Sequence, residues 1–328
     1  MARTKSQKGK RPGSDAGVAV AITRGRAQAA TVAKFREGQR RKRARAVAAA
    51  TTGPARRRAL GPSPIPPHIR RALGTRASAG LLIAEGDSWF DYPFNDVLRL
   101  LEDDHGYDVE STAHKGDCVE DMAYSGGQFE EFARLLEKLL RRGQVPDAIL
   151  LSGGGNDIAG AEFAMLLNHA ASGLPPINQD IVRGVIDVRL RNAYAFLISG
   201  LTELARRFLE RPIPILTHGY DYPIPDGRGF LGGFFVLPGP WLEPGFHKKG
   251  HGDVTANAKV MRSLIDDFNG MLKSVSSVPQ FPHVKYIDLR GTLASGSTYK
   301  KDWANELHPS AKGFATVTAM FAAAIDAL

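Results

Sequence analysis

The chain has 328 residues, 43% of them hydrophobic, and a formal net charge of +9, a composition that suits a globular protein with a sizeable core. Its single cysteine, Cys118, excludes an intramolecular disulfide and a cysteine-rich zinc site, and no apolar run reaches the roughly 20 residues of a membrane-spanning helix. The charge is unevenly distributed. The first 76 residues hold 20 Lys and Arg but only two acids, Asp15 and Glu37, whereas the remainder holds 23 basic and 32 acidic residues. The sequence therefore predicts a basic extension before a mildly acidic body.

The extension divides into three parts. Residues 1–16 are polar and basic without periodicity, so we expect them to be disordered. Residues 17–50 are rich in alanine, carry the basic run RRKRARA at 40–46, and can form a helix. Residues 51–68 contain several prolines and glycines, which is typical of a semi-rigid linker.

We therefore predict two parts, a mostly disordered or partly helical extension over residues 1–76 and one domain over 77–328. No clear secretory signal precedes the domain, so we expect a cytoplasmic protein; the arginine-rich N-terminus leaves an organellar transit peptide as the alternative. Residues 1–58 are candidates for non-specific contact with a polyanion, either nucleic acid or an anionic membrane.

Short apolar runs alternate with longer helical patterns beyond residue 78. The predicted strands are Leu81–Ala84, Asp108–Ala113, Ala148–Ser152, Ile213–Thr217 and Val284–Leu289. The predicted helices are Asp96–Glu102, Phe129–Arg142, Ile181–Leu209, Thr255–Val275 and Ala311–Leu328. This alternation predicts an α/β fold with a doubly wound, flavodoxin-like, five-stranded parallel sheet and helices on both faces. Ligands of such sheets bind beyond the carboxyl ends of the strands.

Four polar or glycine positions follow predicted strands or precede the last predicted helix. Ser88 stands in LLIAEGDSWF, Gly116 in AHKGD, Asn156 in LLSGGGND and His308 in NELHPSAKGF. Because the carboxyl ends of parallel strands share one edge of a sheet, we expect these residues to meet there. A serine hydroxyl becomes nucleophilic when an imidazole accepts its proton. The backbone N–H groups of Ser88 and Gly116 and the side-chain amide of Asn156 can then form an oxyanion hole.

These blocks resemble the motifs of the SGNH, or GDSL-type, hydrolases over about residues 80–328. The matching segments are Gly86-Asp87-Ser88, Gly116, Gly154-Gly155-Asn156-Asp157 and His308-Pro309, in the order found in that superfamily. The resemblance implies the same doubly wound α/β fold and a serine esterase or lipase-like activity that needs no cofactor.

One position departs from the family pattern. The usual acid three residues before the histidine is Asn305 in this chain. An amide oxygen can still accept the ring N–H and orient the imidazole, but it brings no charge. We expect Asn305 in that role, with Asp302 as the second choice and a Ser-His dyad helped by a backbone carbonyl as a further alternative.

The segment from Thr217 to Gly252 is the predicted substrate loop. It is rich in glycine, proline and aromatic residues, and its candidates for contact with the substrate are Tyr220, Tyr222, Phe234 and Trp241. A lid of this kind would give an apolar wall beside the nucleophile, and a surface Ω-loop packed on the body is the alternative. No metal site is predicted, since His247 and His251 lie among glycines where we do not expect helical spacing.

The sequence therefore predicts hydrolysis of a small-molecule, glycan or lipid carboxylic ester through an acyl-enzyme. Thioester or amide hydrolysis by the same groups stays open. The alternative from another class is a weakly active or non-catalytic binding module, which the basic extension would tether to a polyanion.

Overall fold

The computed structural model describes residues 12–52, 78–125, 127–160, 162–232 and 238–328. Its centre is one five-stranded sheet with the order β2-β1-β3-β4-β5, in which every neighbouring pair is parallel. The strands are β1 (Leu81–Glu85), β2 (Asp108–Ser111), β3 (Ala148–Leu151), β4 (Ile215–His218) and β5 (Val284–Ile287). The prediction of a doubly wound, flavodoxin-like sheet is confirmed, and the order reverses beside β1, where β1 pairs with both β2 and β3.

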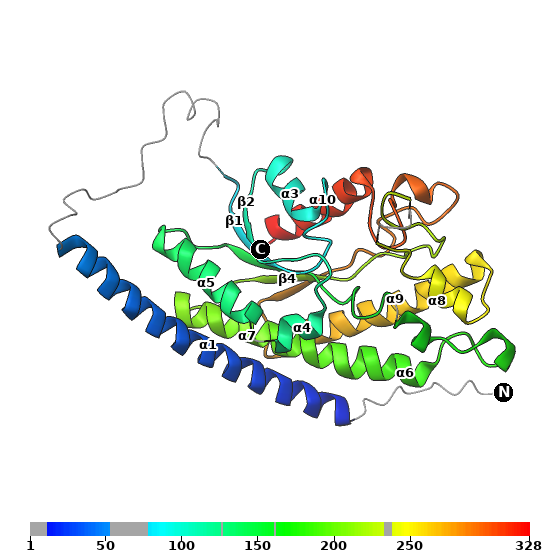
Figure 1. Cartoon of the computed structure of the whole chain (residues 1–328), viewed down its shortest axis with the longest axis horizontal. Helices are drawn as coiled ribbons and strands as arrows, with labels where there is room; N and C mark the ends of the chain where they lie inside the picture. The colour runs from blue at the N-terminus through cyan, green and yellow to red at the C-terminus, as the bar shows by residue number, and fades with distance from the viewer. Residues whose placement is uncertain (1–11, 53–77, 126, 161, 233–237) are drawn as a thin grey trace.

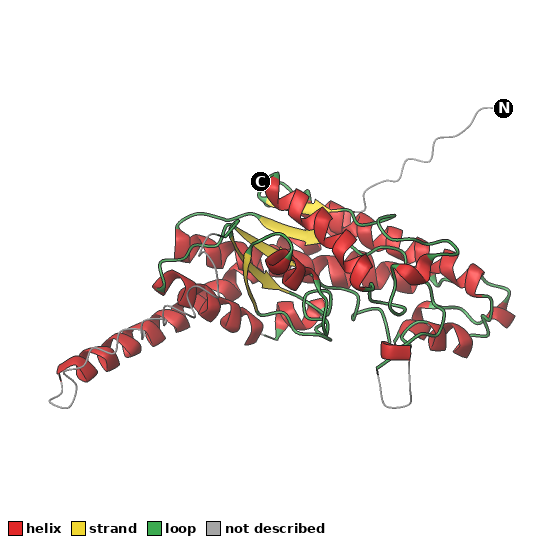
Figure 2. Ribbon diagram, turned by 90° about the horizontal axis from the view of Figure 1, so that it is seen from above, coloured by secondary structure: helices red, strands yellow, loops and turns green. Residues whose placement is uncertain are grey.

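Helices cover both faces of the sheet (Figures 1 and 2). Helices α3 (Val97–Asp103) and α10 (Ala311–Asp326) pack together on one face, and α5 (Gly127–Arg141), α7 (Arg191–Leu209) and α9 (Val254–Ser276) cover the other. The three central strands β1, β3 and β4 are buried almost throughout, as expected for a sheet covered on both sides. Strand ends at the carboxyl edge therefore emerge between two helical layers.

All five predicted helices exist, with small differences in their bounds. The long predicted helix 181–209 is divided into α6 (Gln179–Arg183), a π-helical turn (Gly184–Leu190) and α7. Two short helices were not predicted, α4 (Val119–Tyr124) and α8 (Glu243–Lys248), because six residues carry too little periodicity to separate a helix from a turn.

Residues 12–52 form one continuous helix, α1 (Pro12–Thr52), which lies against α7 and α5 as an outer layer (Figure 1). The prediction that 17–50 can form a helix is confirmed, and the expectation of disorder is wrong for residues 12–16. Thr51 and Thr52, predicted as the start of the linker, are the end of α1. Residues 1–11 and 53–77, which include the rest of the predicted proline-rich linker, lie outside the described residues. Helix α1 therefore extends the core of the body: Val18, Ala21, Ile22, Ala29, Val32 and Ala33 on it are buried.

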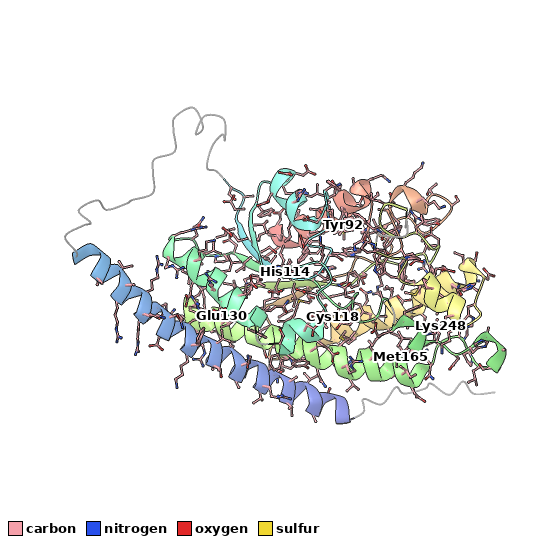
Figure 3. The ribbon with its side chains drawn as sticks, viewed as in Figure 1. Tyr92, His114, Cys118, Glu130, Met165 and Lys248 are labelled. Carbon is pink, nitrogen blue, oxygen red and sulfur yellow. The ribbon has the colours of Figure 1, made fainter. Side chains whose placement is uncertain are left out.

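Two contacts explain why α1 packs so closely. An added Cβ at Gly25 would stand 2.2 Å from the carbonyl oxygen of Phe196 on α7, so only glycine allows the two helices this approach. Farther along, Arg36 reaches across to α5, where its guanidinium lies 2.9 Å from Glu130 and 2.7 Å from Glu137. Figure 3 labels Glu130 on α5. The Glu137 side chain is only 2% exposed, so this ion pair sits in the interface.

Replacing Glu137 by alanine is expected to loosen α1. The change leaves the Arg36 guanidinium, 12% exposed, without its closest partner, which for a buried pair costs about 3 kcal/mol. Urea denaturation and hydrogen exchange of the α1 amides measure the loss. Glu203→Ala is the matched control. Among the described residues Glu203 pairs only with Arg207, which is 46% exposed, and such a pair contributes less than about 1 kcal/mol. Equal destabilisation by the two variants would contradict this role of Glu137.

Candidate active site

The first and last predicted blocks meet beyond the carboxyl end of β1. Ser88 lies three residues after this strand, and His308 lies in the turn before α10. The Ser88 Oγ and His308 Nε2 atoms are 2.7 Å apart, a distance at which the imidazole can accept the hydroxyl proton. The structure thus brings together two residues that are 220 positions apart in the chain.

Asn305 occupies the third position of the arrangement. Its Oδ1 accepts hydrogen bonds from the backbone N–H groups of Leu307 and His308, both at 2.9 Å, and lies 3.1 Å from His308 Nδ1. The two backbone donors fix which side of the amide carries the oxygen. Because an amide oxygen only accepts, His308 Nδ1 must carry the ring proton, which leaves Nε2 free to face Ser88.

The imidazole of His308 lies between two aromatic rings. Tyr92 stacks on it, with ring centroids 4.3 Å apart, and Trp241 meets it edge-on at 5.6 Å (Figure 3 labels Tyr92). Burial lowers the pKa of His308 to about 3, so the ring is neutral at physiological pH. Asn305 contributes no negative charge to offset this effect.

Tyr92 also bonds to Asn305, whose Nδ2 donates to the Tyr92 hydroxyl at 3.0 Å. Tyr92→Phe removes this acceptor and leaves a buried amide N–H unsatisfied, at a cost of about 1–2 kcal/mol. We expect kcat for a short-chain aryl ester to fall about 5- to 30-fold, with KM nearly unchanged, because the amide then holds the imidazole less well.

Tyr107→Phe is the control for that prediction. It removes a comparable hydroxyl bond, to Asp326 at 2.7 Å, far from His308, and should leave kcat unchanged. If both variants lose the same stability and neither loses kcat, Tyr92 does not position the Asn305–His308 pair.

Neither nearby acid contacts the His308 ring. The Asp302 carboxylate, our second choice for the third position, accepts from Lys312 Nζ at 2.6 Å and from the Ala294 backbone N–H at 2.9 Å. Glu306 is fully buried, and its carboxylate accepts from four backbone N–H groups, those of Gly227, Trp241, Leu242 and Glu243. Asp302 thus stabilises the start of α10, and Glu306 ties the predicted substrate loop to the His308 turn.

Beneath Ser88, a buried polar network joins three strand ends. Asp87 accepts from the Ser152 hydroxyl at 2.7 Å, from the Trp89 backbone N–H at 3.0 Å, and from the Tyr220 hydroxyl. Tyr220 in turn accepts from the Gly155 backbone N–H at 3.2 Å. Because the network spans the loops after β1, β3 and β4, it holds the Ser88 turn and the Asn156 turn in one arrangement.

The predicted oxyanion donors lie on the loops after β1, β2 and β3. The Asn156 side-chain amide donates to the Asp117 carbonyl at 2.9 Å, directly beside Gly116, whose φ is +93°. The backbone N–H groups of Ser88 and Gly116 have no hydrogen-bond acceptor among the described residues. Two unused backbone donors and a second amide hydrogen on Asn156 are what an oxyanion hole requires.

A mostly apolar pocket opens beside Ser88 and His308. Its apolar wall comes chiefly from α9 and from the loop after β3, with Met261, Leu264, Ile265 and Phe268 on the helix and Ile158 and Ala159 on the loop. The two carboxylates in the lining, Asp87 and Asp221, are both occupied by hydrogen bonds from the protein; Asp221 accepts from the backbone of Tyr222, Gly291 and Leu293. The pocket therefore suits an uncharged, apolar group.

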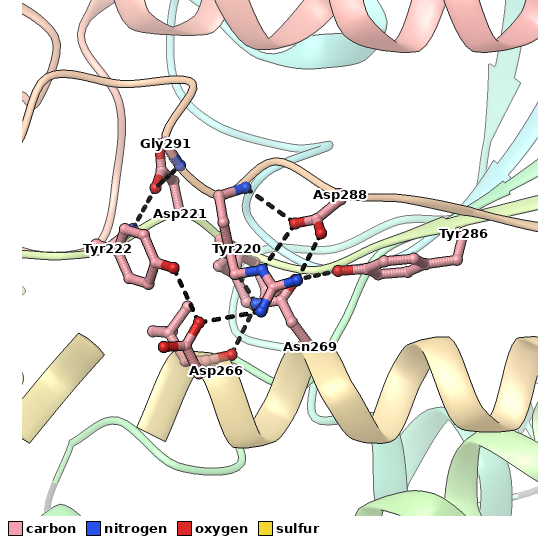
Figure 4. Close-up of polar contacts among 10 residues, drawn as sticks. Tyr220, Asp221, Tyr222, Asp266, Asn269, Tyr286, Asp288 and Gly291 are labelled. Carbon is pink, nitrogen blue, oxygen red and sulfur yellow. Dashed lines mark hydrogen bonds and ion pairs between the residues drawn. The ribbon is translucent and has the colours of Figure 1, made fainter. Parts of the chain in front are cut away.

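The predicted substrate-loop residues lie in different places. Tyr220 lines the pocket as a buried residue of the network under Ser88, and Trp241 packs against His308. Tyr222 lies away from the pocket: its hydroxyl donates to Asp266 at 2.8 Å (Figure 4), and its ring lies 3.7 Å from the Arg262 guanidinium. Phe234 lies outside the described residues.

Sequence reasoning missed Tyr92 and the role of Glu306 as a loop anchor. Tyr92 is four residues after Ser88, which is a signal of proximity, but its contacts with Asn305 and His308 span more than two hundred positions. His247 lies on the short helix α8, but this helix ends at Lys248, so His247 and His251 do not share a helix, as expected. Within the described residues, no group of three or more His, Cys, Asp or Glu could hold a metal ion.

Two further observations concern groups outside the Ser88 site. Burial raises the pKa of the Cys118 thiol to about 12, and surrounding acids add to the shift, so this cysteine is not an activated nucleophile. Among the residues described, no helix combines the length and the apolar character needed to cross a bilayer.

No protein-family model and no curated protein matches the chain. Solved structures do resemble it. A lipase from a goat rumen metagenome is 16% identical, with 74% of this chain and 96% of that chain covered and a TM-score of 0.44. An extracellular lipase from Streptomyces rimosus is 15% identical, with 75% and 100% covered and a TM-score of 0.39. A variant of an acetyl-xylooligosaccharide esterase from Geobacillus is 14% identical, with 76% and 95% covered and a TM-score of 0.34. Others are ascribed to the SGNH hydrolases and the G-D-S-L family.

Proposed function

We propose that this protein is a serine hydrolase of the SGNH type that cleaves carboxylic esters through an acyl-enzyme. The observation that carries the proposal is the Ser88–His308–Asn305 arrangement, with 2.7 Å between Ser88 Oγ and His308 Nε2 and 3.1 Å between His308 Nδ1 and Asn305 Oδ1. His308 Nε2 is unprotonated and can accept the Ser88 proton, and Nδ1 carries the proton that Asn305 Oδ1 accepts.

In the first step, Ser88 Oγ attacks the ester carbonyl carbon while His308 Nε2 takes the hydroxyl proton. The carbonyl oxygen becomes an oxyanion, which the backbone N–H groups of Ser88 and Gly116 and the Asn156 amide stabilise; one such donor contributes about 3 kcal/mol. Collapse of this intermediate breaks the bond to the alcohol, which leaves with the proton from His308.

Water then reverses the sequence. His308 Nε2 takes a proton from the water, the hydroxide attacks the acyl carbon, and Ser88 leaves with the proton as the carboxylic acid is released. Asn305 holds the ring through Nδ1 in every step but offers only a dipole to the imidazolium that forms. We therefore expect slower turnover than an Asp-supported triad would give.

The pocket beside Ser88 is suited to bind the acyl group of the substrate, and its lining favours an apolar one. Its free lining is aliphatic and aromatic, and both carboxylates in it are already hydrogen-bonded. This favours lipid-type or simple aliphatic esters over glycan esters, whose hydroxyl groups would find few partners in the pocket.

A panel of p-nitrophenyl esters with acyl chains of increasing length tests the proposal. We expect hydrolysis with a KM that falls as methylenes are added until the pocket is filled, since each buried methylene contributes about 0.8 kcal/mol. Ala159→Phe narrows the pocket and should move the preference to acetate, whereas Ala256→Phe on the exposed side of α9 should not.

No hydrolysis of any ester, thioester or anilide in such a panel would contradict the proposal. That outcome would leave the non-catalytic binding module, which the missing charge at Asn305 favours, as the better account of this fold.

A further inference from the structure

The second half of α1 is a basic helix that leaves the body. Up to Arg36 one side of α1 is buried against α5 and α7, but every residue from Arg40 to Ala49 is exposed. We call residues 37–52 the basic arm. It is the end of α1 that runs past the other helices in Figure 1 and stands out from them in Figure 2. The docked half anchors it through Arg36 and the two glutamates of α5.

Within the described residues, the basic arm carries three cations that are not paired with an acid. Five of the six residues from Arg40 to Arg45 are Arg or Lys, and consecutive helical residues are turned by about 100°. Arg40 lies 3.6 Å from Glu137, and Arg41 pairs with Glu37 at 2.5 Å. Lys42, Arg43 and Arg45 have no ion-pair partner among the described residues. These three cations therefore lie within about 160° of the helix circumference, on the side turned away from Arg40 and the body.

The arm stands at the opposite end of the sheet from Ser88. The Arg40 guanidinium lies 5.1 Å from the ring of Phe208, near the end of α7, and its other neighbour, Glu137, is near the end of α5. These two helices lead into the amino ends of β4 and β3, whereas Ser88 and His308 lie beyond the carboxyl edge. A macromolecule bound to the basic arm would therefore not cover the pocket beside Ser88.

We propose that the basic arm binds the phosphate backbone of double-stranded DNA without reading its sequence. A helix with side chains is about 10–12 Å wide, and the major groove of B-form DNA is about 12 Å wide with phosphates on both sides. Long cationic side chains spread over about 160° of the helix can therefore reach the phosphates of both strands. The deep, narrow major groove of double-stranded RNA would not admit the helix.

A bilayer surface fits the arm less well. Membrane-surface helices carry Trp, Phe or Leu on the side that enters the bilayer. The apolar residues of the arm are alanines and Val47. A membrane bound at this end would also face away from Ser88. The proposal does not depend on the esterase activity.

The test uses the full-length chain and a short fluorescein-labelled DNA duplex, with fluorescence anisotropy measured over a range of NaCl concentrations. We expect binding at about 50 mM NaCl that weakens steeply with salt, as counterion release requires. The triple variant K42Q/R43Q/R45Q should bind at least about tenfold more weakly at 100 mM NaCl and should flatten the salt slope by about 2–3, or about one per lost phosphate contact. Glutamine is nearly as good a helix former as these residues.

The control K248Q/K300Q/K301Q removes the same charge from exposed lysines outside α1. It should keep the wild-type affinity, and circular dichroism should show equal helix content in all three proteins. The proposal is overturned if the wild type does not bind the duplex, if the control loses as much affinity as the arm variant, or if vesicles of phosphatidylserine and phosphatidylcholine bind while the duplex does not.

Discussion

Ser88→Ala is expected to lower kcat/KM for p-nitrophenyl butyrate by about 10⁴- to 10⁶-fold. The alanine variant keeps the oxyanion donors and the pocket, so the residual rate reports binding and electrostatics without a nucleophile. The change is also small for the fold, because Ser88 Oγ makes only the bond to His308 Nε2 among the described residues. Initial rates and a melting temperature for the same preparation separate loss of chemistry from loss of structure.

Ser295→Ala is the matched control for that result. Ser295 is an exposed loop serine with no side-chain hydrogen bond in the described structure, and its loss should leave kcat/KM unchanged. A Ser88→Ala variant that keeps wild-type turnover with an intact fold would show that the hydrolysis comes from another group.

His308→Ala should be about as inactive as Ser88→Ala, and the double variant should be no worse than either single one. Ser88 and His308 act as a unit, so the second substitution has nothing further to remove. Additive losses, by contrast, would mean that the 2.7 Å contact between Ser88 Oγ and His308 Nε2 is not used in the reaction. Both variants must be tested on one ester at saturating and at low concentration.

The pH dependence gives an independent test of the environment of His308. Burial lowers its pKa to about 3, and the imidazole must be neutral to accept the Ser88 proton. We therefore expect kcat/KM to stay level as the pH falls from 7 to about 4 and to decrease only below that. An acid limb near the ordinary histidine pKa of about 6.5 would mean that water reaches the ring in the free enzyme.

The same shift lowers the stability of the fold in acid. The unfolded chain binds a proton at His308 below about pH 6.5, whereas the folded chain does so only near pH 3. The stabilisation is thus fully present above pH 6.5 and is lost as the pH falls towards 3. Burial also raises the pKa of Glu85 to about 8, so the stability contributed by this group falls as the pH rises from about 4.5 to 8. The His308 effect is therefore best measured as the difference in stability between wild type and His308→Ala.

Features set by residues close together in the sequence could be predicted, and contacts between distant residues could not. Strands such as Leu81–Glu85 are set by local apolar runs, and the positions of Ser88, Gly116 and Asn156 follow from the strand ends, so these parts were predictable. Other contacts at the site join segments that are far apart in the sequence. Examples are the hydrogen bond between Asn305 and Tyr92 and the bonds from the 227–243 loop to the Glu306 carboxylate.

The docking of α1 was beyond sequence reasoning for a similar reason. Its alanine-rich pattern predicts a helix but not which side is buried, because small residues give a weak apolar stripe. The decisive features are Gly25 against Phe196 and Arg36 against Glu137, and each needs a partner more than a hundred positions away.

Covalent labelling tests the central claim most directly. A fluorophosphonate transfers its phosphonyl group to an activated serine oxygen and releases fluoride, and the proton from the hydroxyl is taken up by the neighbouring imidazole. Mass spectrometry of the digested protein should show a single adduct on Ser88, formed slowly or not at all in His308→Ala. An unlabelled protein, or an adduct on another residue while Ser88 stays free, would contradict the assignment of Ser88 as the nucleophile.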